Sequence, residues 1–347
     1  MVTRLDTPAP VRTVALLLVV MAMIAWAGPA SAARAPASSR AASPEPQERS
    51  GLPWSSGVTP VDVLGANAER FGVKRGTPVD NIVVYPGRES WRAMLSTFWT
   101  RALPSYFVPA EDDLVVSLPL WPASRSAKRT GSRENWTTLG TNIAAVDANA
   151  YVRLGWEMNV NAFHWALTPA NRGAWVSGFR RAARLITSTC PRCRIVWNPN
   201  HGADQTGASS RAAFFRVKGK VDVYAIDDYD IYPPIKDADS RRRHMNDYGQ
   251  WNESLRFARS QGLKLAVPEW GIACNGPGCQ WRGNAGGDNP MFIRAFQRWF
   301  EENARFIAFE SYFDEPTRTS RSSLYTRPIG PRAGREYRAG LLRVLSR

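Results

Sequence analysis

The stretch YVRLGWEMN, residues 151–159, has the pattern of a strand whose two faces differ in chemistry. Side chains alternate between the faces of a strand. One set is apolar: Val152, Leu154, Trp156 and Met158. The other set is Arg153, Gly155, Glu157 and Asn159. Such a face packs poorly against helices, but it suits the inside of a closed barrel near its carboxyl end.

Apolar runs of this kind alternate with segments of helical periodicity along the chain. The candidate strands are residues 81–85, 105–108, 114–121, 151–157, 193–197, 221–227, 264–269 and 305–312. The candidate helices are residues 89–101, 135–147, 170–187, 250–261 and 290–303. This alternation is typical of a parallel α/β fold, and eight strands favour a single-domain (β/α)8 TIM barrel over an open sheet. No GxGxxG follows the first strand and no P-loop is present, so nucleotide binding is not expected.

The N-terminal segment has the features of an export signal rather than of a part of the barrel. Two Arg precede the apolar run Val14–Ala27, which ends in GPASA. We expect a signal peptide at 1–32 and a disordered Ala, Pro, Ser and Arg linker at 33–52. The alternative, an uncleaved anchor, is disfavoured because 14 apolar residues are short for a membrane span. The folded barrel domain would then occupy residues 53–347 of a secreted protein.

The chain carries 45 Lys and Arg against 30 Asp and Glu, a formal charge of +15, and only six of the basic residues are Lys. The Arg are mostly scattered and accompany no nucleic-acid-binding motif, so nucleic acid is not an expected partner. An Arg-rich surface is the simplest interpretation, with adhesion to an anionic cell-envelope polymer as an alternative. The histidines, His164, His201 and His244, are too dispersed to predict a metal site, and we expect a monomer without cofactor.

The four cysteines form two close pairs in the sequence, CPRC at 190–193 and CNGPGC at 274–279. Three pairings are possible, and a zinc site or a redox pair competes in principle. The predicted strands put Cys190 and Cys193 at the beginning of one strand and Cys274 and Cys279 beyond the end of another. Bridges within each pair are the pairing that fits such a fold, and an exported protein favours disulfides.

A second carboxylate follows a second strand. In KLAVPEWG, residues 264–271, Glu269 ends an apolar strand and shares a face with Leu265 and Val267 by strict alternation. Glutamates after strands four and seven can converge at the barrel mouth. Retaining glycoside hydrolysis needs two carboxyl groups about 5–5.5 Å apart, one protonated and one ionised. The structural alternative is that each Glu binds loop amides or a basic neighbour.

At this point the sequence resembles glycoside hydrolase family 26, a family of clan A barrel glycosidases that includes β-mannanases. Four motifs carry the resemblance in chain order: Arg153 with Glu157, Met158, Asn159 and Trp165; Trp197-Asn198-Pro199-Asn200; Asp227-Asp228-Tyr229; and Glu269-Trp270-Gly271. One position departs from the family pattern, because Trp156 stands where the family has a His before the acid/base.

The resemblance implies a retaining endo-β-glycosidase that hydrolyses a β-linked polysaccharide, most closely β-mannan. Glu157 would be the acid/base and Glu269 the nucleophile, with no metal or cofactor. The expected substrate-binding residues are Arg153, Asn159, Trp165, Asn200, Tyr229, Trp270 and Tyr312, with Phe313 as the alternative to the last. Asp227, Asp228 and Glu310 also end strands but rank lower. A non-catalytic glycan-binding barrel on the cell envelope is the competing hypothesis, motivated by Trp156 and the many Arg.

Overall fold

The computed structural model describes residues 49–60, 65–109, 111–123, 131–275, 279, 283–316 and 321–347. The predicted signal peptide and residues 33–48 of the predicted linker lie outside these ranges. The last four residues assigned to the linker belong to the packed unit instead. Arg49 forms ion pairs with Glu111 and Asp112, and the side chain of Leu52 is buried. The folded part therefore begins earlier than residue 53.

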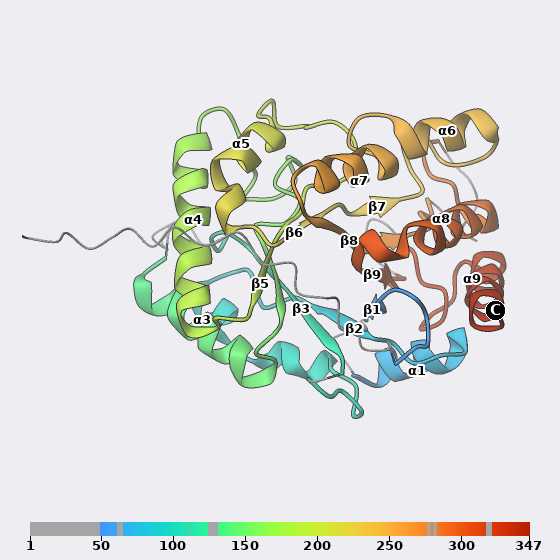
Figure 1. Ribbon diagram of the computed structural model, residues 1–347, viewed down its shortest axis with the longest axis horizontal. Helices are drawn as coiled ribbons and strands as arrows, with labels where there is room; N and C mark the ends of the chain where they lie inside the picture. The colour runs from blue at the N-terminus through green and yellow to red at the C-terminus, as the bar shows by residue number, and fades with distance from the viewer. Residues whose placement is uncertain are drawn as a thin grey trace, which may run out of the picture. The chain divides into compact units, whose positions relative to one another are not determined.

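Parallel strands form a closed ring (Figure 1). Its strands are β1 (Ser56–Thr59), β2 (Asn81–Val84), β3 (Asp113–Leu118), β4 (Tyr151–Leu154), β5 (Arg194–Trp197), β6 (Val223–Ala225), β8 (Lys264–Gly271) and β9 (Ile307–Phe313). Each strand pairs with the next, β1 pairs with β9, and β6 pairs directly with β8. The two-residue strand β7 (Asp228–Tyr229) continues the course of β6 along the far end of β8. The predicted (β/α)8 barrel is confirmed.

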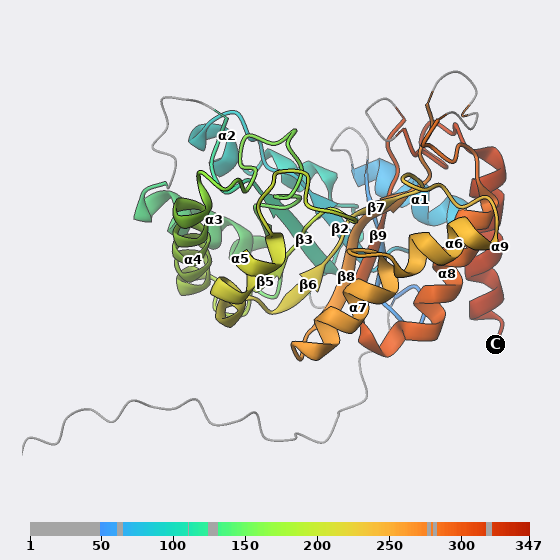
Figure 2. The same ribbon diagram turned by 90° about the horizontal axis from the view of Figure 1, so that it is seen from above.

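Helices surround the ring. They are α1 (Gly65–Arg75), α2 (Trp91–Leu95), α3 (Arg133–Val146), α4 (Arg172–Thr189), α5 (Ser210–Val217), α6 (Ala238–Asn246), α7 (Trp251–Ser260), α8 (Pro290–Asn303) and α9 (Pro331–Leu345), with short 3-10 turns η2 (Phe98–Ala102), η3 (Lys218–Lys220) and η5 (Ala304–Phe306). In Figure 2, α3, α4 and α5 flank one side of the barrel and α6 to α9 the other. Within the described ranges, no helix has the length and apolar character that crossing a bilayer requires.

One predicted strand is absent and one strand was not predicted, so the number of barrel strands is still eight. Residues 105–108 form a turn rather than a strand. The missed strand is β1, whose sequence SGVT has a single large apolar residue, Val58, and so lacks the run that marks the others. The predicted helix at 89–101 is broken into α2 and η2 at Ser96, whose backbone N–H bonds back to Ala93. YVRL nevertheless remains the fourth strand.

The alternation in β4 separates two layers of core, as predicted. Val152 and Leu154 face outward into the large apolar cluster beneath the helices. Tyr151 and Arg153 face the lumen. A small apolar cluster fills the lumen below Arg153 and consists of Val83, Val115, Tyr151, Val196, Val223, Ala225, Ala266 and Phe309. The polar residues at the carboxyl ends of the strands therefore rest on an apolar floor.

Strand β8 breaks the alternation that the sequence suggested. Leu265 and Val267 lie in the outer apolar layer, and strict alternation would place Glu269 there too. The pairing of β8 with β9 is irregular between Val267 and Trp270. This irregularity shifts the phase, so that Glu269 faces the lumen and Trp270 faces the helices. The predicted shared face was wrong, although the predicted position of the carboxylate was not.

The disulfides join Cys190 with Cys193 and Cys274 with Cys279, as predicted. The first precedes β5 and the second follows β8, so they lie at opposite ends of the parallel barrel. Each bridge closes a short loop, and disulfides are typical of proteins that work in oxidising compartments.

We predict that Gly57→Ala in β1 destabilises the protein by about 1–3 kcal/mol, because the added methyl would overpack a closed site. A Cβ at Gly57 would lie 2.1 Å from the backbone oxygen of Asn81 on β2. Denaturant unfolding measures the change. Gly173→Ala in α4 is the matched control, since nothing lies within 4 Å of its Cβ position; there we expect no loss of stability. Equal stability of both variants would contradict the tight β1–β2 approach.

Candidate functional site: two glutamates around a buried arginine

Glu157 reaches the barrel mouth on a turn rather than on the predicted extended strand. Regular pairing ends at Leu154, and two of the next residues, Gly155 (φ 62°) and Glu157 (φ 49°), adopt left-handed backbone conformations. A hydrogen bond from the backbone N–H of Glu157 to the carbonyl oxygen of Asn198, at 2.6 Å, holds this turn against the end of β5. Glu157 is 8% exposed. A left-handed non-glycine residue is uncommon and is often found at functional sites.

Arg153 is the central cation of the site and is fully buried. Its guanidinium donates to the carboxylate of Glu269 at 2.9 Å and forms an ion pair with Asp227. Three further acceptors complete its shell: Asn198 Oδ1 at 2.6 Å, Ser117 Oγ at 2.9 Å and the Tyr85 hydroxyl at 3.2 Å. The planar fork of an arginine suits such a multiply shared role, and the shell fixes its direction.

Glu269 is held by three donors from three elements. Arg153 and the Tyr85 hydroxyl donate to Oε1, at 2.9 and 2.5 Å, and the Tyr229 hydroxyl donates to Oε2 at 3.0 Å. The arrangement thus fixes the direction of the Glu269 carboxylate, with both oxygens engaged.

Glu157 has a different environment. Among the described residues, the side-chain amide of Asn200 is its donor. Asn159 holds Asn200 in place, accepting from its backbone N–H at 2.8 Å and donating to its carbonyl oxygen at 2.9 Å. Burial, and next the negative charge of Glu269, raise the pKa of Glu157 to about 8, whereas Asn200 and Arg153 oppose the rise. Glu157 is therefore protonated at neutral pH.

The aromatic residues beside Glu157 do not present the stacking surface that was expected of Trp165. Trp165 is fully buried; its ring packs against Trp156 (centroids 4.4 Å apart) and Phe163 (4.6 Å), and its indole N–H donates to the Trp156 carbonyl oxygen at 2.7 Å. Its role is to support the turn that carries Glu157. Trp156 packs edge-on against Tyr85, with 5.6 Å between the ring centroids.

Trp270 and Tyr312 also fail as sugar platforms, because both are fully buried on the outer side of the barrel. Their rings pack against one another, 5.1 Å between centroids, and both contact Tyr337 of α9. The alternative, Phe313, lies on the mouth side. Its half-buried ring packs edge-on against Tyr229 at 5.9 Å.

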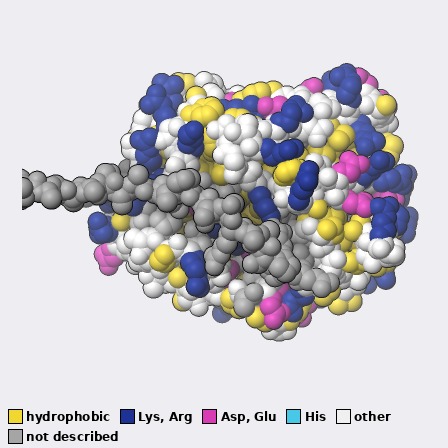
Figure 3. Space-filling view, in the orientation of Figure 1, with side chains coloured by type: hydrophobic (Ala, Val, Ile, Leu, Met, Phe, Trp, Pro, Cys, Tyr) yellow, Lys and Arg dark blue, Asp and Glu magenta, His cyan; other side chains and the backbone are white. Residues whose placement is uncertain are grey.

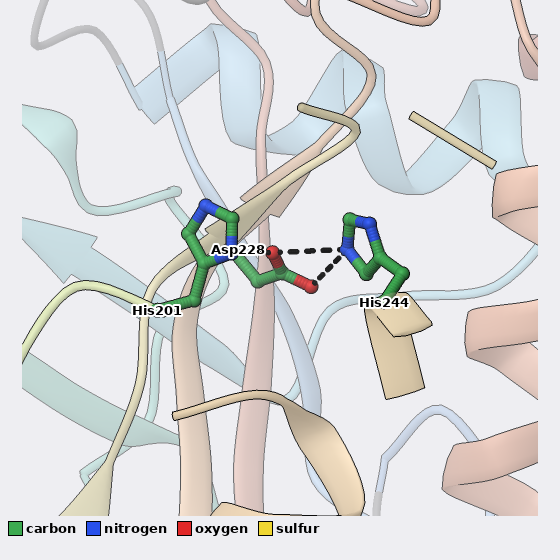
Figure 4. A group of neighbouring side chains, drawn as sticks. All are labelled: His201, Asp228 and His244. Carbon is green, nitrogen blue, oxygen red and sulfur yellow. Dashed lines mark hydrogen bonds and ion pairs between the residues drawn. The ribbon is translucent and has the colours of Figure 1, made fainter. Parts of the chain in front are cut away.

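The remaining strand-end acids have separate roles. Glu310 lies outside the lumen, where it accepts hydrogen bonds from the indoles of Trp54 and Trp270. Asp227 is a partner of Arg153, and burial raises its pKa while Arg153 opposes the rise. Asp228 joins His201 and His244 in a buried cluster (Figure 4), although the sequence spacing had suggested that the histidines were dispersed. His164 stays apart, bonded to the Trp121 carbonyl oxygen.

Sequence reasoning missed three residues that contact the central arginine: Tyr85, Ser117 and Asn198. Tyr85 ends the predicted strand NIVVY, and Asn198 lies inside the quoted WNPN motif, so a search for polar groups at strand ends would have included both. Ser117 is a single small polar residue within an apolar strand, β3, and only the register of β3 against β4, which pairs it with Arg153, reveals its contact.

Basic side chains do not gather into one patch on the face in Figure 3; they are spread among apolar and acidic ones. Several described surface Arg are paired, such as Arg294 with Glu336 and Arg298 with Glu302. Adhesion to an anionic polymer stays a hypothesis.

No family model and no curated protein matches the sequence. Solved structures share its fold at low identity. They include a glucosidase from Croceicoccus marinus (TM-score 0.55, 11% identity, 86% of this chain and 67% of that one), the catalytic domain of a GH26 endo-β-1,4-mannanase from Bacillus sp. JAMB-750 (0.53, 14%, 85% and 88%) and a GH128 endo-β-1,3-glucanase from Sorangium cellulosum (0.52, 13%, 82% and 98%). These likenesses establish the (β/α)8 fold and leave the family unassigned.

We predict that Arg153→Met destabilises the protein by about 3–5 kcal/mol, because it leaves Asp227 buried without its cation. Arg298→Met, which breaks an exposed pair on α8, should cost less than about 1 kcal/mol. Denaturant unfolding at pH 7 compares them. Adding Asp227→Asn to Arg153→Met should recover part of the loss, and strict additivity of the two changes would contradict a direct interaction.

Proposed function

We propose that this protein is a retaining endo-β-glycosidase acting on a β-linked polysaccharide, most closely a β-mannanase of glycoside hydrolase family 26. The observation that carries the proposal is the unequal environment of the two glutamates at the barrel mouth. Glu269 is oriented by three donors including a cation, whereas Glu157 is buried with a raised pKa. A nucleophile must be ionised and an acid protonated. The ion pair of Glu269 with Arg153 supports the first role, and the raised pKa of Glu157 supports the second.

In the first step, Glu269 attacks the anomeric carbon and forms an ester to the sugar, while Glu157 gives its proton to the departing glycosidic oxygen. In the second step, the ionised Glu157 takes a proton from water, whose oxygen attacks the anomeric carbon and releases Glu269. The product keeps the configuration of the substrate, and Glu157 ends protonated again.

Arg153 keeps this cycle electrostatically balanced. When Glu269 becomes an ester it loses its negative charge, but Arg153 retains Asp227 as a partner and is not left as an unpaired buried cation. Loss of the Glu269 charge also removes one of the causes that raise the pKa of Glu157. The acid can therefore release its proton in the first step and act as a base in the second.

The substrate class rests on the family resemblance and is the finer part of the proposal. The structural neighbours are described as acting on β-1,4-mannan and β-1,3-glucan, and a further one, at TM-score 0.51, is a fungal β-1,4-galactanase. A screen of the purified protein on mannan, β-1,3-glucan, galactan, mixed-linkage glucan and xylan, with analysis of product length, identifies the substrate and distinguishes internal from terminal cleavage. NMR of the first product, before its anomers interconvert, shows whether the anomeric configuration of the substrate is retained.

We predict that Glu269→Gln lowers kcat about 10³-fold or more on the identified polysaccharide, because the amide cannot form the glycosyl ester. Glu157→Gln should lower it about 10²- to 10⁴-fold, and much less on an aryl glycoside whose leaving group needs no protonation. Glu302→Gln on α8 is the control for the same chemical change at an exposed site and should leave kcat unchanged.

A glycan-binding barrel without turnover is the outcome that would replace this proposal. It is indicated if the wild type binds an oligosaccharide but releases no reducing ends, and if both Glu→Gln variants bind it equally well. Trp156 motivates the alternative, since its ring replaces a polar group beside Glu157.

We also predict that kcat/KM falls as the pH rises through about 8, because the acid form of Glu157 is lost there and only that form protonates the leaving group. Asn200→Ala removes a hydrogen bond that favours the charged form, so its alkaline limb should move to higher pH. A pH profile of kcat/KM from pH 5 to 10 measures the alkaline limb of the wild type and of Asn200→Ala. A limb that stays in place in Asn200→Ala would show that another group controls it.

A further inference from the structure

A buried polar cluster lies directly behind the site, and we call it the His–Asp–His clamp: His201, Asp228 and His244 (Figure 4). Both rings are directed at the Asp228 carboxylate. The distances are 2.9 Å from His201 Nδ1 to Oδ1 and 3.0 Å from His244 Nε2 to Oδ2. His201 is 7% exposed, and Asp228 and His244 are fully buried. Nothing in the reaction derived above uses these three side chains.

Counting donors and acceptors shows how the cluster is held together. His244 Nδ1 lies 2.6 Å from the Pro233 carbonyl oxygen, and its Nε2 faces Asp228, so both ring nitrogens face acceptors and both must carry hydrogen. His244 is therefore an imidazolium. Asp228 receives a third donor, the indole N–H of Trp251. With hydrogen on both of its nitrogens, His244 has no lone pair to offer a metal ion.

The charges around His244 agree with this assignment. Asp228, first among the charged neighbours, raises the pKa of His244 to about 9 against the effect of burial, and Asp230 adds a smaller contribution. His201 and His244 in turn hold the pKa of Asp228 below its usual value, although burial opposes them. Asp230 is itself buried and accepts from the side-chain amide of Asn289 at 2.7 Å.

The clamp is connected to the catalytic groups through immediate chain neighbours. His201 follows Asn200, whose amide binds Glu157. Asp228 precedes Tyr229, whose hydroxyl binds Glu269. The two segments are joined by a hydrogen bond of 2.9 Å from the His201 backbone N–H to the carbonyl oxygen of residue 227.

These segments have little regular structure of their own. Strand β5 ends at Trp197 and β6 at Ala225, and β7 has only two residues. Beyond the regular ladder, the direction of each side chain needs another restraint. The clamp supplies it from the outer helices, because His244 belongs to α6 and Trp251 begins α7.

We propose that the His–Asp–His clamp consists of positioning residues for the two glutamates. It holds the amide of Asn200 against Glu157. It also holds the hydroxyl of Tyr229 against Glu269. The role assigned to these glutamates rests on the proposed function, but the restraint itself is a property of the fold.

The test is the pKa of Glu157, read by NMR titration of protein labelled at the Glu side-chain carboxyl carbon and assigned with Glu157→Gln. His201→Leu and His244→Leu should raise this pKa by about 0.5–1 unit, because Asn200 no longer stabilises the charged form. His201→Asn keeps an N–H near the position of Nδ1 and should leave it unchanged, as should the matched control His164→Leu. An unchanged pKa in both clamp variants, with the native spectrum retained, would overturn the proposal.

Two further measurements keep the test decisive. If the clamp variants do not fold, Trp251→Phe removes one donor to Asp228 but keeps a ring, and it should shift the pKa of Glu157 upward by a smaller amount; no shift overturns the proposal. Elemental analysis should find the same metal content in the wild type and in His244→Leu. One equivalent lost in that variant would make the cluster a metal site instead.

The titration needs no substrate, so its result stands whether or not hydrolysis is found. If the protein is active, His244→Leu should lower kcat about 10-fold with KM changed less than twofold, since the clamp does not touch the substrate. Activity without this split, together with an unmoved Glu157 pKa, would contradict the clamp alone. Absence of activity, together with a shifted pKa, would contradict the glycosidase proposal alone.

Discussion

The arrangement of the barrel mouth depends on a single buried cation. Arg153 has no exposed surface, and it contacts two carboxylates, those of Asp227 and Glu269. A third carboxyl, that of Glu157, shares the same enclosed space without a hydrogen bond from Arg153 among the described contacts. One positive charge cannot neutralise three negative charges away from water. Burial, and next the negative charge of Glu269, raise the pKa of Glu157, whereas Glu269 has the cation as its direct partner.

The regular barrel positions the cation, whereas irregular backbone positions the acids. Arg153 lies on a strand whose inward face continues the apolar floor of the lumen. Glu157 reaches the mouth on a left-handed turn, and Glu269 enters it because β8 changes phase. Such departures from regular geometry cost stability. The buried aromatic residues once expected to bind sugar instead pack behind these two irregular segments and hold them.

The sequence alone predicts a strand and its faces only where the alternation of apolar and polar residues is long enough to be recognised. The alternation of apolar and polar residues in YVRL correctly assigned both faces of β4. β1 was missed because four residues with one large apolar side chain give no periodic signal. Trp270 and Tyr312 were assigned to the mouth by motif, and only the irregular pairing of β8 with β9 shows that they face the helices. The clamp could not be predicted because its members lie far apart in the sequence, in the loop after β5, in strand β7 and in helix α6.

Closure of the ring has a consequence for how the molecule acquires its structure. The pairing of β1 with β9 joins Ser56 to Glu310, so contacts between the two ends of the folded chain complete the barrel. Contacts between residues so far apart in the sequence form slowly, because the entropy of closing a long loop is lost before the strand pairing stabilises the chain. The cation and its acid partners come from β4, β7, β8 and the segments near them. During synthesis, the mouth therefore cannot assemble until most of the polypeptide has emerged from the ribosome.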